Sequence, residues 1–170
     1  MAVIPIRTYG DPVLRRETKP VERINRELRM LSRDMAETMA DGKGIGLAAP
    51  QVGESLSLIV VDLSLGQEQN KAVALINPRI LGAEGEEVRE EGCLSIPDIH
   101  GDVIRAAEIG VRFHDIEGRE HELECQDLLA RVILHEIDHL HGVLFVDRIS
   151  PLKRQMLRGK LRKMAKQPTT

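Results

Sequence analysis

The sequence has few aromatic residues, few cysteines and no long apolar run. Its 170 residues include no tryptophan, one tyrosine, two phenylalanines and two cysteines, Cys93 and Cys125. Two cysteines make no disulfide framework of the kind that stabilises small secreted proteins. No apolar run approaches the roughly 18 residues of a membrane-spanning helix, and residues 1–7 lack the features of a secretory signal or a transit peptide. We therefore expect a cytoplasmic protein with no membrane segment.

The composition otherwise fits a globular protein with a charged tail. Hydrophobic residues make up 42% of the chain, enough for one sizeable core and one domain. The net charge of −3 conceals an asymmetry, because residues 151–170 hold seven of the 24 basic residues and none of the 27 acidic ones. Residues 1–150 thus carry about −10 and the tail about +7. The body has no basic face suited to nucleic acid, whereas the tail has the charge for one.

Apolar residues at helical spacing predict three helices. The first covers roughly residues 22–38, and the turn at 41–44 ends it. The second covers about 126–141, and Gly142 is placed to stop it. The third follows residue 150, and its apolar stripe is expected to pack on the body while its basic residues face solvent. The stripe consists of Leu152, Met156, Leu157, Leu161 and Met164, and the basic residues are Lys153, Arg154, Lys160, Arg162 and Lys163.

Short segments rich in branched apolar residues predict strands at 57–62 and 72–76. Two further segments, 108–114 and 119–124, flank the turn-like residues 115–118 and predict a hairpin. Strands followed by a buried helix and a terminal helix indicate an α+β fold. We expect mixed or antiparallel sheets around the helix at 126–141, with one more helix at the C-terminal end.

The predicted central helix carries His135-Glu136-Ile137-Asp138-His139. Positions four apart on a helix differ by about 40° in azimuth, so both imidazoles can bind one ion from the same face. Glu136 lies beside this pair, about 100° round the helix from His135, where a carboxylate can handle the protons of a water on the ion. Taken alone, the motif also fits a surface helix that happens to be rich in histidine and acids.

Cys93 stands in the segment Glu-Gly-Cys-Leu-Ser at 91–95. If it supplies a thiolate, two imidazoles and one sulfur leave the fourth position of a tetrahedral ion open for water, which is typical of a catalytic site. A structural site would need a fourth ligand from His141 or Cys125. His141 lies about 240° round the helix from His135 and faces elsewhere. Cys125 is expected to be a small packed residue.

Three segments together resemble the peptide deformylases. They are Gly-Ile-Gly-Leu-Ala-Ala-Pro-Gln at 44–51, Glu-Gly-Cys-Leu-Ser at 91–95 and His-Glu-Ile-Asp-His-Leu-His-Gly at 135–142. Residues 8–15 are also similar to the family's amino terminus, so the resemblance runs from about residue 4 to residue 148. It implies a catalytic domain at 1–150, followed by a basic helix and tail at 151–170. The implied activity is hydrolytic removal of the formyl group from the amino-terminal formyl-methionine of new polypeptides.

The resemblance also implies the roles of the site residues. It assigns the metal to Cys93, His135 and His139, with ferrous iron as the physiological ion and zinc, nickel or cobalt as substitutes. Thiolate plus imidazole suits several first-row ions, so the ligands do not choose among them. The formyl oxygen is assigned to the metal, the side-chain amide of Gln51 and the backbone N–H of Leu94. Glu136 would take a proton from water and hand it to the leaving amine.

An apolar slot beside the metal would suit the methionine side chain that the resemblance implies. Leu128 and Val132 share a helix face with His135, although ordinary core packing explains them equally well. Gly44 and Gly46 flank Ile45 and allow the backbone to approach a ligand closely. The predicted substrate-binding residues are Ile45, Gly46, Leu128 and Val132.

Three positions depart from the family's pattern. Leu134 replaces the Gln that relatives commonly have before the ligand histidine, His100 stands where some relatives have an Arg that touches the substrate backbone, and Arg89 stands where an apolar pocket residue can occur. These departures leave open the substrate preference beyond the first residue. Asp138 has three interpretations, which are orientation of a ligand imidazole, pairing with Arg105, and solvation on the helix surface.

Two other classes of function are compatible with the motif. A His-Glu-x-x-His endopeptidase is disfavoured because zincins rarely recruit cysteine as third ligand. A non-catalytic metal or nascent-chain binding protein would need neither Glu136 nor Gln51. The partners that the resemblance implies are N-formyl-Met nascent polypeptides and the ribosome, the latter through basic residues 153–166. A solvated basic face is the alternative for that helix.

Overall fold

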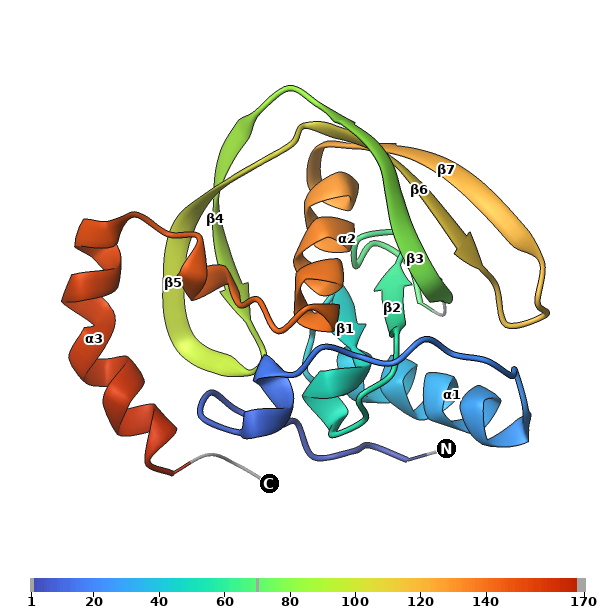
Figure 1. Cartoon of the computed structure of the whole chain (residues 1–170), viewed down its shortest axis with the longest axis horizontal. Helices are drawn as coiled ribbons and strands as arrows, with labels where there is room; N and C mark the ends of the chain where they lie inside the picture. Colours follow the sequence, from blue (N-terminus) through green and yellow to red (C-terminus); the bar gives the residue numbers. More distant parts are fainter. Residues whose placement is uncertain (1, 70, 168–170) are drawn as a thin grey trace.

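The helix α2 (Asp127–Leu140) stands between two antiparallel sheets (Figure 1). The computed structural model describes residues 2–69 and 71–167. The larger sheet has the strand order β1-β2-β3-β6-β7, and β4 and β5 form the smaller one. This architecture confirms the predicted α+β fold. The strands are β1 (Gly46–Ala48), β2 (Leu58–Asp62), β3 (Ala72–Glu84), β4 (Glu87–Cys93), β5 (Ile96–Arg105), β6 (Glu108–His114) and β7 (Glu120–Gln126).

Side chains cap the first turns of α1 and α3. The side chain of Asn25 accepts a hydrogen bond from the Leu28 N–H at 2.9 Å, so α1 (Arg26–Asp41) starts later than the predicted residue 22. The helix α3 (Pro151–Ala165) follows the N-cap Ser150. Gly142, at φ 72°, lies just beyond α2, as predicted. In the described part of the chain, no helix combines the length and the apolar content that a membrane crossing requires.

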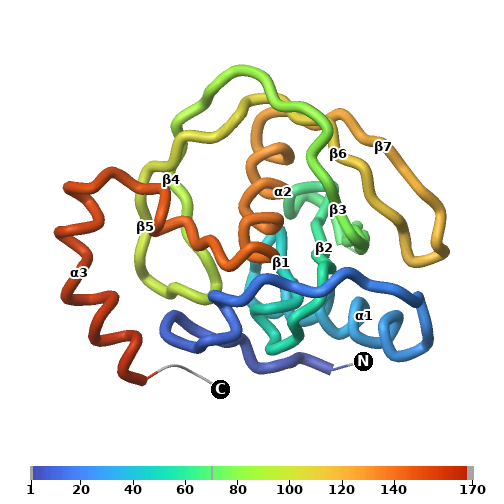
Figure 2. The backbone as a smooth tube through the Cα atoms, in the orientation of Figure 1, coloured from blue at the N-terminus to red at the C-terminus, as the bar shows by residue number. Residues whose placement is uncertain are grey.

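The structure contains the four predicted strands and adds three, β1, β4 and β5. β2 and the hairpin of β6 and β7 lie where the sequence predicted them, whereas β3 continues to Glu84, far past the predicted end at 76. β4 and β5 were not predicted, because the sequence Glu-Val-Arg-Glu-Glu-Gly-Cys of β4 lacks the apolar alternation of a strand. Two connections link the sheets, one from β3 to β4 and one from β5 to β6, and they lie side by side (Figure 2).

One apolar cluster fixes α2 on the larger sheet, where Ala130, Ile133 and Ile137 meet side chains of β2 and β6. A second cluster lies between β5 and the C-terminal segment and includes Ile99 and Phe145. A third packs α1 on the larger sheet. The larger sheet thus has cores with both α1 and α2, and α2 stands between this sheet and the smaller one (Figure 1).

The structure confirms the predicted apolar stripe of α3 only in part. Leu157 and Leu161 are buried and Met164 packs against them, but Leu152 and Met156 are each 70% exposed. Positions 157, 161 and 164 follow the four-three spacing of one helix face, and 152 and 156 point away from it. The expectation for the basic residues is likewise corrected at two positions, because Lys153 and Arg154 are half-buried. The Arg154 guanidinium donates to the carbonyl of Val146 and to the Asp147 carboxylate.

Candidate metal centre and active site

The structure brings together the three predicted ligands. His135 and His139 project from α2 and Cys93 ends β4, and their ligand atoms all lie within 4.8 Å of one another. The Cys93 Sγ is 3.4 Å from His139 Nε2. A thiolate and two imidazoles in this arrangement fit a tetrahedral transition-metal ion with one open position.

Glu136 borders this cluster and is almost fully buried. Its carboxylate oxygen Oε1 lies 4.0 Å from His139 Nε2. Among the described residues, Glu136 Oε1 and His139 Nδ1 are buried side-chain atoms without a hydrogen-bond partner. Burial raises the pKa of Glu136 to about 7, against the opposing charges of His135 and Arg105. A buried polar oxygen without a partner normally has a functional reason, and an ion or water at this position would supply one.

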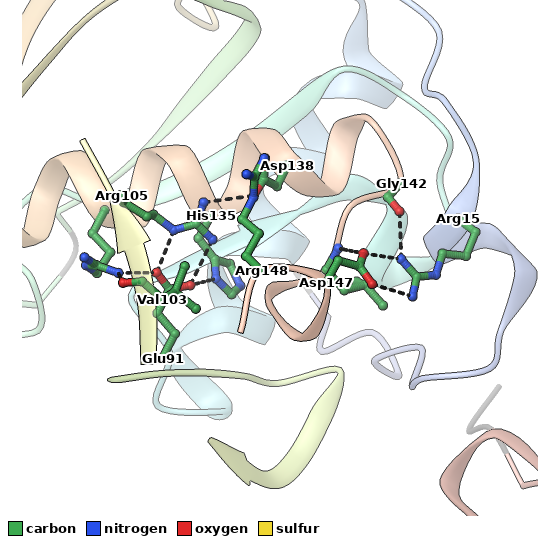
Figure 3. Close-up of polar contacts among 11 residues, drawn as sticks. Arg15, Glu91, Val103, Arg105, His135, Asp138, Gly142, Asp147 and Arg148 are labelled. Atoms are coloured by element: carbon green, nitrogen blue, oxygen red, sulfur yellow. Dashed lines mark hydrogen bonds and ion pairs between the residues drawn. The ribbon is translucent and has the colours of Figure 1, made fainter. Parts of the chain in front are cut away.

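Glu91 is the centre of a buried ionic network that the sequence analysis did not assign (Figure 3). Its carboxylate lies 2.9 Å from His135 Nδ1, and it accepts hydrogen bonds from Arg105 at 2.6 and 2.9 Å and from Arg131 at 2.6 Å. Burial would raise the pKa of Glu91, but the hydrogen bonds from His135 and Arg105 and the Arg105 charge outweigh it and lower the pKa to about 2. Glu91 is therefore ionised. The signal in the sequence was its position two residues before Cys93, within the same motif.

Asp138 extends the network to the protein surface. Its carboxylate accepts a hydrogen bond from Arg105 at 2.9 Å and two from Arg148 at 2.6 and 2.9 Å (Figure 3). Of the three interpretations of this residue, the structure selects the pairing with Arg105. The ligand imidazole is oriented by Glu91 instead.

The side chain of Gln51 reaches the cluster beside Cys93. Its Oε1 accepts a hydrogen bond from the Ala48 N–H at 2.9 Å, and its Nε2 donates to Ser95 Oγ at 3.0 Å and lies 3.4 Å from Cys93 Sγ. These contacts fix the orientation of the amide, with its donor end toward the cluster. The sequence had suggested no role for Ser95. Its hydroxyl oxygen accepts a hydrogen bond from Gln51 and so helps to hold that side chain.

A cleft of about 560 Å³ opens beside the cluster. It is lined by every predicted site residue except His139, which is buried behind it. Gly46 forms a tight part of the wall, because a Cβ there would lie 2.6 Å from Glu136 Oε2 and 2.8 Å from Val132 Cγ1. Gly46 thus lies close to these two side chains, whereas the close approach to a ligand stays a prediction.

The positions that depart from the family's pattern lie at different distances from the cleft. His100 lines the cleft and covers Gly92, where a Cβ would lie 2.7 Å from the ring. Arg89 pairs with Glu87 at 2.6 Å, outside the cleft lining. Arg131, which sequence reasoning missed, lines the cleft and holds Glu91. Leu134 packs against the core of the larger sheet.

The two alternative ligands lie away from the cluster. His141 is exposed and its Nδ1 is 2.7 Å from the Glu17 carboxylate. Cys125 is buried in the core of the larger sheet, as the expectation of a packed residue had it. Neither belongs to the group of ligand atoms around Cys93.

Comparisons with known proteins agree on one family. The family model of polypeptide deformylase matches residues 3–155. A peptide deformylase of Acidobacterium capsulatum is 49% identical over 164 residues, which cover 96% of each chain. A crystal structure of a peptide deformylase from Legionella pneumophila is 44% identical, with a TM-score of 0.89 and 97% and 96% of the two chains covered. One from Synechococcus elongatus in complex with actinonin is 48% identical, with a TM-score of 0.87 and 92% and 87% covered. This chain belongs to the peptide deformylase family.

Proposed function

We propose that this chain hydrolyses the N-formyl group of the amino-terminal formyl-methionine of newly synthesised proteins and releases formate. The observation that carries the proposal is the grouping of three ligand atoms within 4.8 Å beside a buried carboxylate on the wall of a cleft. Membership of the family supplies the substrate class.

Cys93, His135 and His139 would hold the metal. We assign ferrous iron as the ion in the cell, with zinc, nickel or cobalt as substitutes, from the resemblance to the family, since the donors suit each of these ions. When bound, the ion supplies a Lewis acid that polarises the formyl group and makes a water acidic enough to ionise near neutral pH.

Glu136 and Gln51 would carry the protein's part of the reaction. The Glu136 carboxylate, with a pKa of about 7, would accept a proton from the attacking water and donate it to the leaving amine. As the formyl carbon becomes tetrahedral, negative charge develops on its oxygen, and the Gln51 amide and the Leu94 N–H would donate hydrogen bonds to it. The bond from the Ala48 N–H holds Gln51 in position for this role.

The cleft offers an apolar slot and two strand edges to the substrate. Ile45, Leu128 and Val132 would surround the methionine side chain, and Gly46 would let the substrate lie close to Glu136. β1 ends the larger sheet, β4 belongs to a two-stranded sheet, and both strands contribute to the cleft lining. An extended peptide adds to such edges through main-chain hydrogen bonds, which select for backbone rather than for sequence.

The direct test measures formate release from formyl-Met-Ala-Ser by protein loaded with iron under anaerobic conditions. Casein is incubated in parallel. We expect formate from the peptide and intact casein. Cleaved casein without formate would support an endopeptidase instead, and metal binding without either activity would support a binding protein.

We further propose that the chain works in the cytoplasm and that residues 153–166 dock on the ribosome, with residues 1–150 as the catalytic domain. Arg158 and Arg162 are exposed, lie one turn apart on α3, and line a groove of about 520 Å³. Arg154 lines the same groove one turn earlier, where it is paired with Asp147. Guanidinium groups in such a row suit RNA phosphates, and binding of this kind weakens steeply with salt.

Charge reversal tests the docking better than truncation, because removal of α3 would also uncover the core around Leu157 and Leu161. We expect the variant Arg158→Glu/Arg162→Glu to lose salt-sensitive co-sedimentation with ribosomes. The matched control, Arg26→Glu/Arg29→Glu, changes two exposed residues of α1 and should co-sediment like the wild type. Equal co-sedimentation of the wild type and both variants would contradict the docking and show that the basic face of α3 is only solvated.

A further inference from the structure

A second cavity adjoins the cleft. It measures about 850 Å³ and lies between α1, the turn that follows α1, and the loop that joins β2 to β3. Lys43, Gly44 and Ile45 line both this cavity and the cleft. The two spaces thus share one wall of three consecutive residues.

The cavity owes its room to small residues. Ala36 and Ala40 of α1, Gly44 of the turn, Gly66 of the loop and Ala72 of β3 all contribute to its lining. Residues without long side chains leave space for a backbone to approach. These small residues leave room for a peptide main chain in this space.

The loop that closes the cavity is held by its own hydrogen bonds. The Asp62 carboxylate accepts bonds from the Ser64 N–H at 2.9 Å, the Ser64 hydroxyl at 2.7 Å and the Gly66 N–H at 2.9 Å. A Cβ on Gly66 would lie 3.7 Å from Ile45 Cγ2, so the loop stands directly against the shared wall. The shape of the cavity is thus built into the fold.

The charges around the cavity are mixed. Glu68 pairs with Lys71 at 3.4 Å, and Asp62 is engaged by the loop. The remaining charged groups of the lining are two cations, Arg33 and Lys43, and one carboxylate, Glu37. Such a rim can contact charged side chains of either sign, as a protein that acts on many different polypeptides requires.

The direction of β1 leads from the reaction centre to this cavity. Gly46 lies against Glu136, and the chain runs back from there through Ile45 and Gly44 to Lys43 at the edge of the second cavity. Lys43 lies in the turn that precedes β1, at φ 58°, so the extended edge begins only at Gly46. A substrate strand antiparallel to β1 would run past Ile45 toward this turn.

We propose that the second cavity receives the residues of the substrate polypeptide that follow those bound in the cleft, because Lys43, Gly44 and Ile45 line both spaces. The inference rests on the proposed function, since it takes the formyl-methionine end to be bound at Glu136. It makes α1 and the loop between β2 and β3 a binding surface for the body of the nascent chain. Longer formyl-peptides then gain contacts that a tripeptide lacks.

The test compares kcat/KM for formyl-Met-Ala-Ser with kcat/KM for a formylated octapeptide that begins with the same three residues. Ala40→Trp fills the cavity from an exposed helical position, and Glu37→Trp does so from the neighbouring turn of the helix. Met30→Trp, at a half-exposed position of the same helix outside the cavity lining, is the matched control. Melting temperatures of the three variants check that each is folded.

We expect the wild type and Met30→Trp to favour the octapeptide, and the ratio of long to short kcat/KM to fall at least about threefold in Ala40→Trp and Glu37→Trp. An unchanged ratio in both folded cavity variants, or equal kcat/KM for the two peptides in the wild type, overturns the inference while the tripeptide activity still supports the proposed function. Absence of formate from either peptide would instead count against the proposed function itself.

Discussion

The Nδ1 atom of His135 lies 2.9 Å from the carboxylate of Glu91. Because Glu91 is ionised, it accepts this hydrogen bond and keeps the proton on Nδ1, which leaves Nε2 free to bind an ion. Arg105 and Arg131 hold the carboxylate from the other side. The orientation of a ligand histidine thus depends on residues that contribute no ligand atom.

Glu91→Gln should weaken metal binding. The amide can still accept from His135, but it loses the charge that two guanidinium groups require, so we expect metal affinity to fall about 10- to 100-fold. Competition with a chelator for nickel measures it. Glu90→Gln, on the exposed neighbouring residue, is the control and should bind like the wild type. Equal affinity of all three proteins would contradict the role that we give to Glu91.

Glu136→Ala should separate metal binding from turnover. Glu136 lies beside the three ligand atoms and is not one of them, so the variant should keep close to one equivalent of metal. Loss of the group that moves protons should lower kcat by at least about a hundredfold. Metal content by elemental analysis and formate release are measured on the same preparation. Loss of the metal would show that the carboxylate is a ligand.

Gly46→Ala should impair catalysis through Glu136. The added methyl group would lie 2.6 Å from Glu136 Oε2 and 2.8 Å from Val132 Cγ1, so the carboxylate has to move. A displacement of this size should lower kcat/KM at least about tenfold while the metal stays bound. Gly82→Ala places a methyl group where no atom lies within 4 Å and should retain normal activity. Similar rates for the two alanine variants would exclude the contact as a constraint.

The iron form should be sensitive to oxygen. A thiolate such as Cys93 on a redox-active ion gives oxidants two adjacent targets, and nickel removes one of them. We expect the iron enzyme to lose activity in air during an assay, and the nickel enzyme to keep it. The measurement is the half-life of formate release for each form in air and under argon. Equal half-lives in air would refute this account.

Asp147→Asn should make the free energy of unfolding less dependent on pH in the acid range. Burial would raise the pKa of Asp147, but hydrogen bonds from Arg15 and the Leu144 N–H, with the Arg15 charge, lower it. A carboxyl whose folded-state pKa is depressed stabilises the fold above its unfolded value of about 4, and the contribution disappears as the pH falls through the folded value. The free energy of unfolding, from urea titrations, should therefore differ between wild type and variant at pH 6, and the difference should shrink below about pH 4. A difference independent of pH would assign the effect to packing.

The sequence predicted the elements that carry a regular apolar pattern. The residues of α2 and the β6–β7 hairpin were placed almost to the residue, because their apolar positions repeat with the period of a helix or a strand. β4 was missed because Glu87, Arg89 and Glu91 are charged, and only the tertiary structure shows which charges are buried. The motifs identified the ligand set, because residues four positions apart on a helix lie on the same face. The pairing of Arg105 with Asp138 was one of the interpretations from the sequence, but the contacts of Arg105 and Arg131 with Glu91 were not predicted, because Glu91 is remote from both in the sequence.

The network around Glu91 connects the strand of Cys93 to the helix of both histidines through protein groups alone. In a zinc finger, by contrast, the ion organises the chain, and a chelator unfolds it. Here an ion would arrive after folding, in a frame that already exists, and could leave again without dismantling it. One molecule could accordingly exchange metals during its lifetime, and its activity at any moment would report the metal supply of its surroundings rather than the conditions of its synthesis.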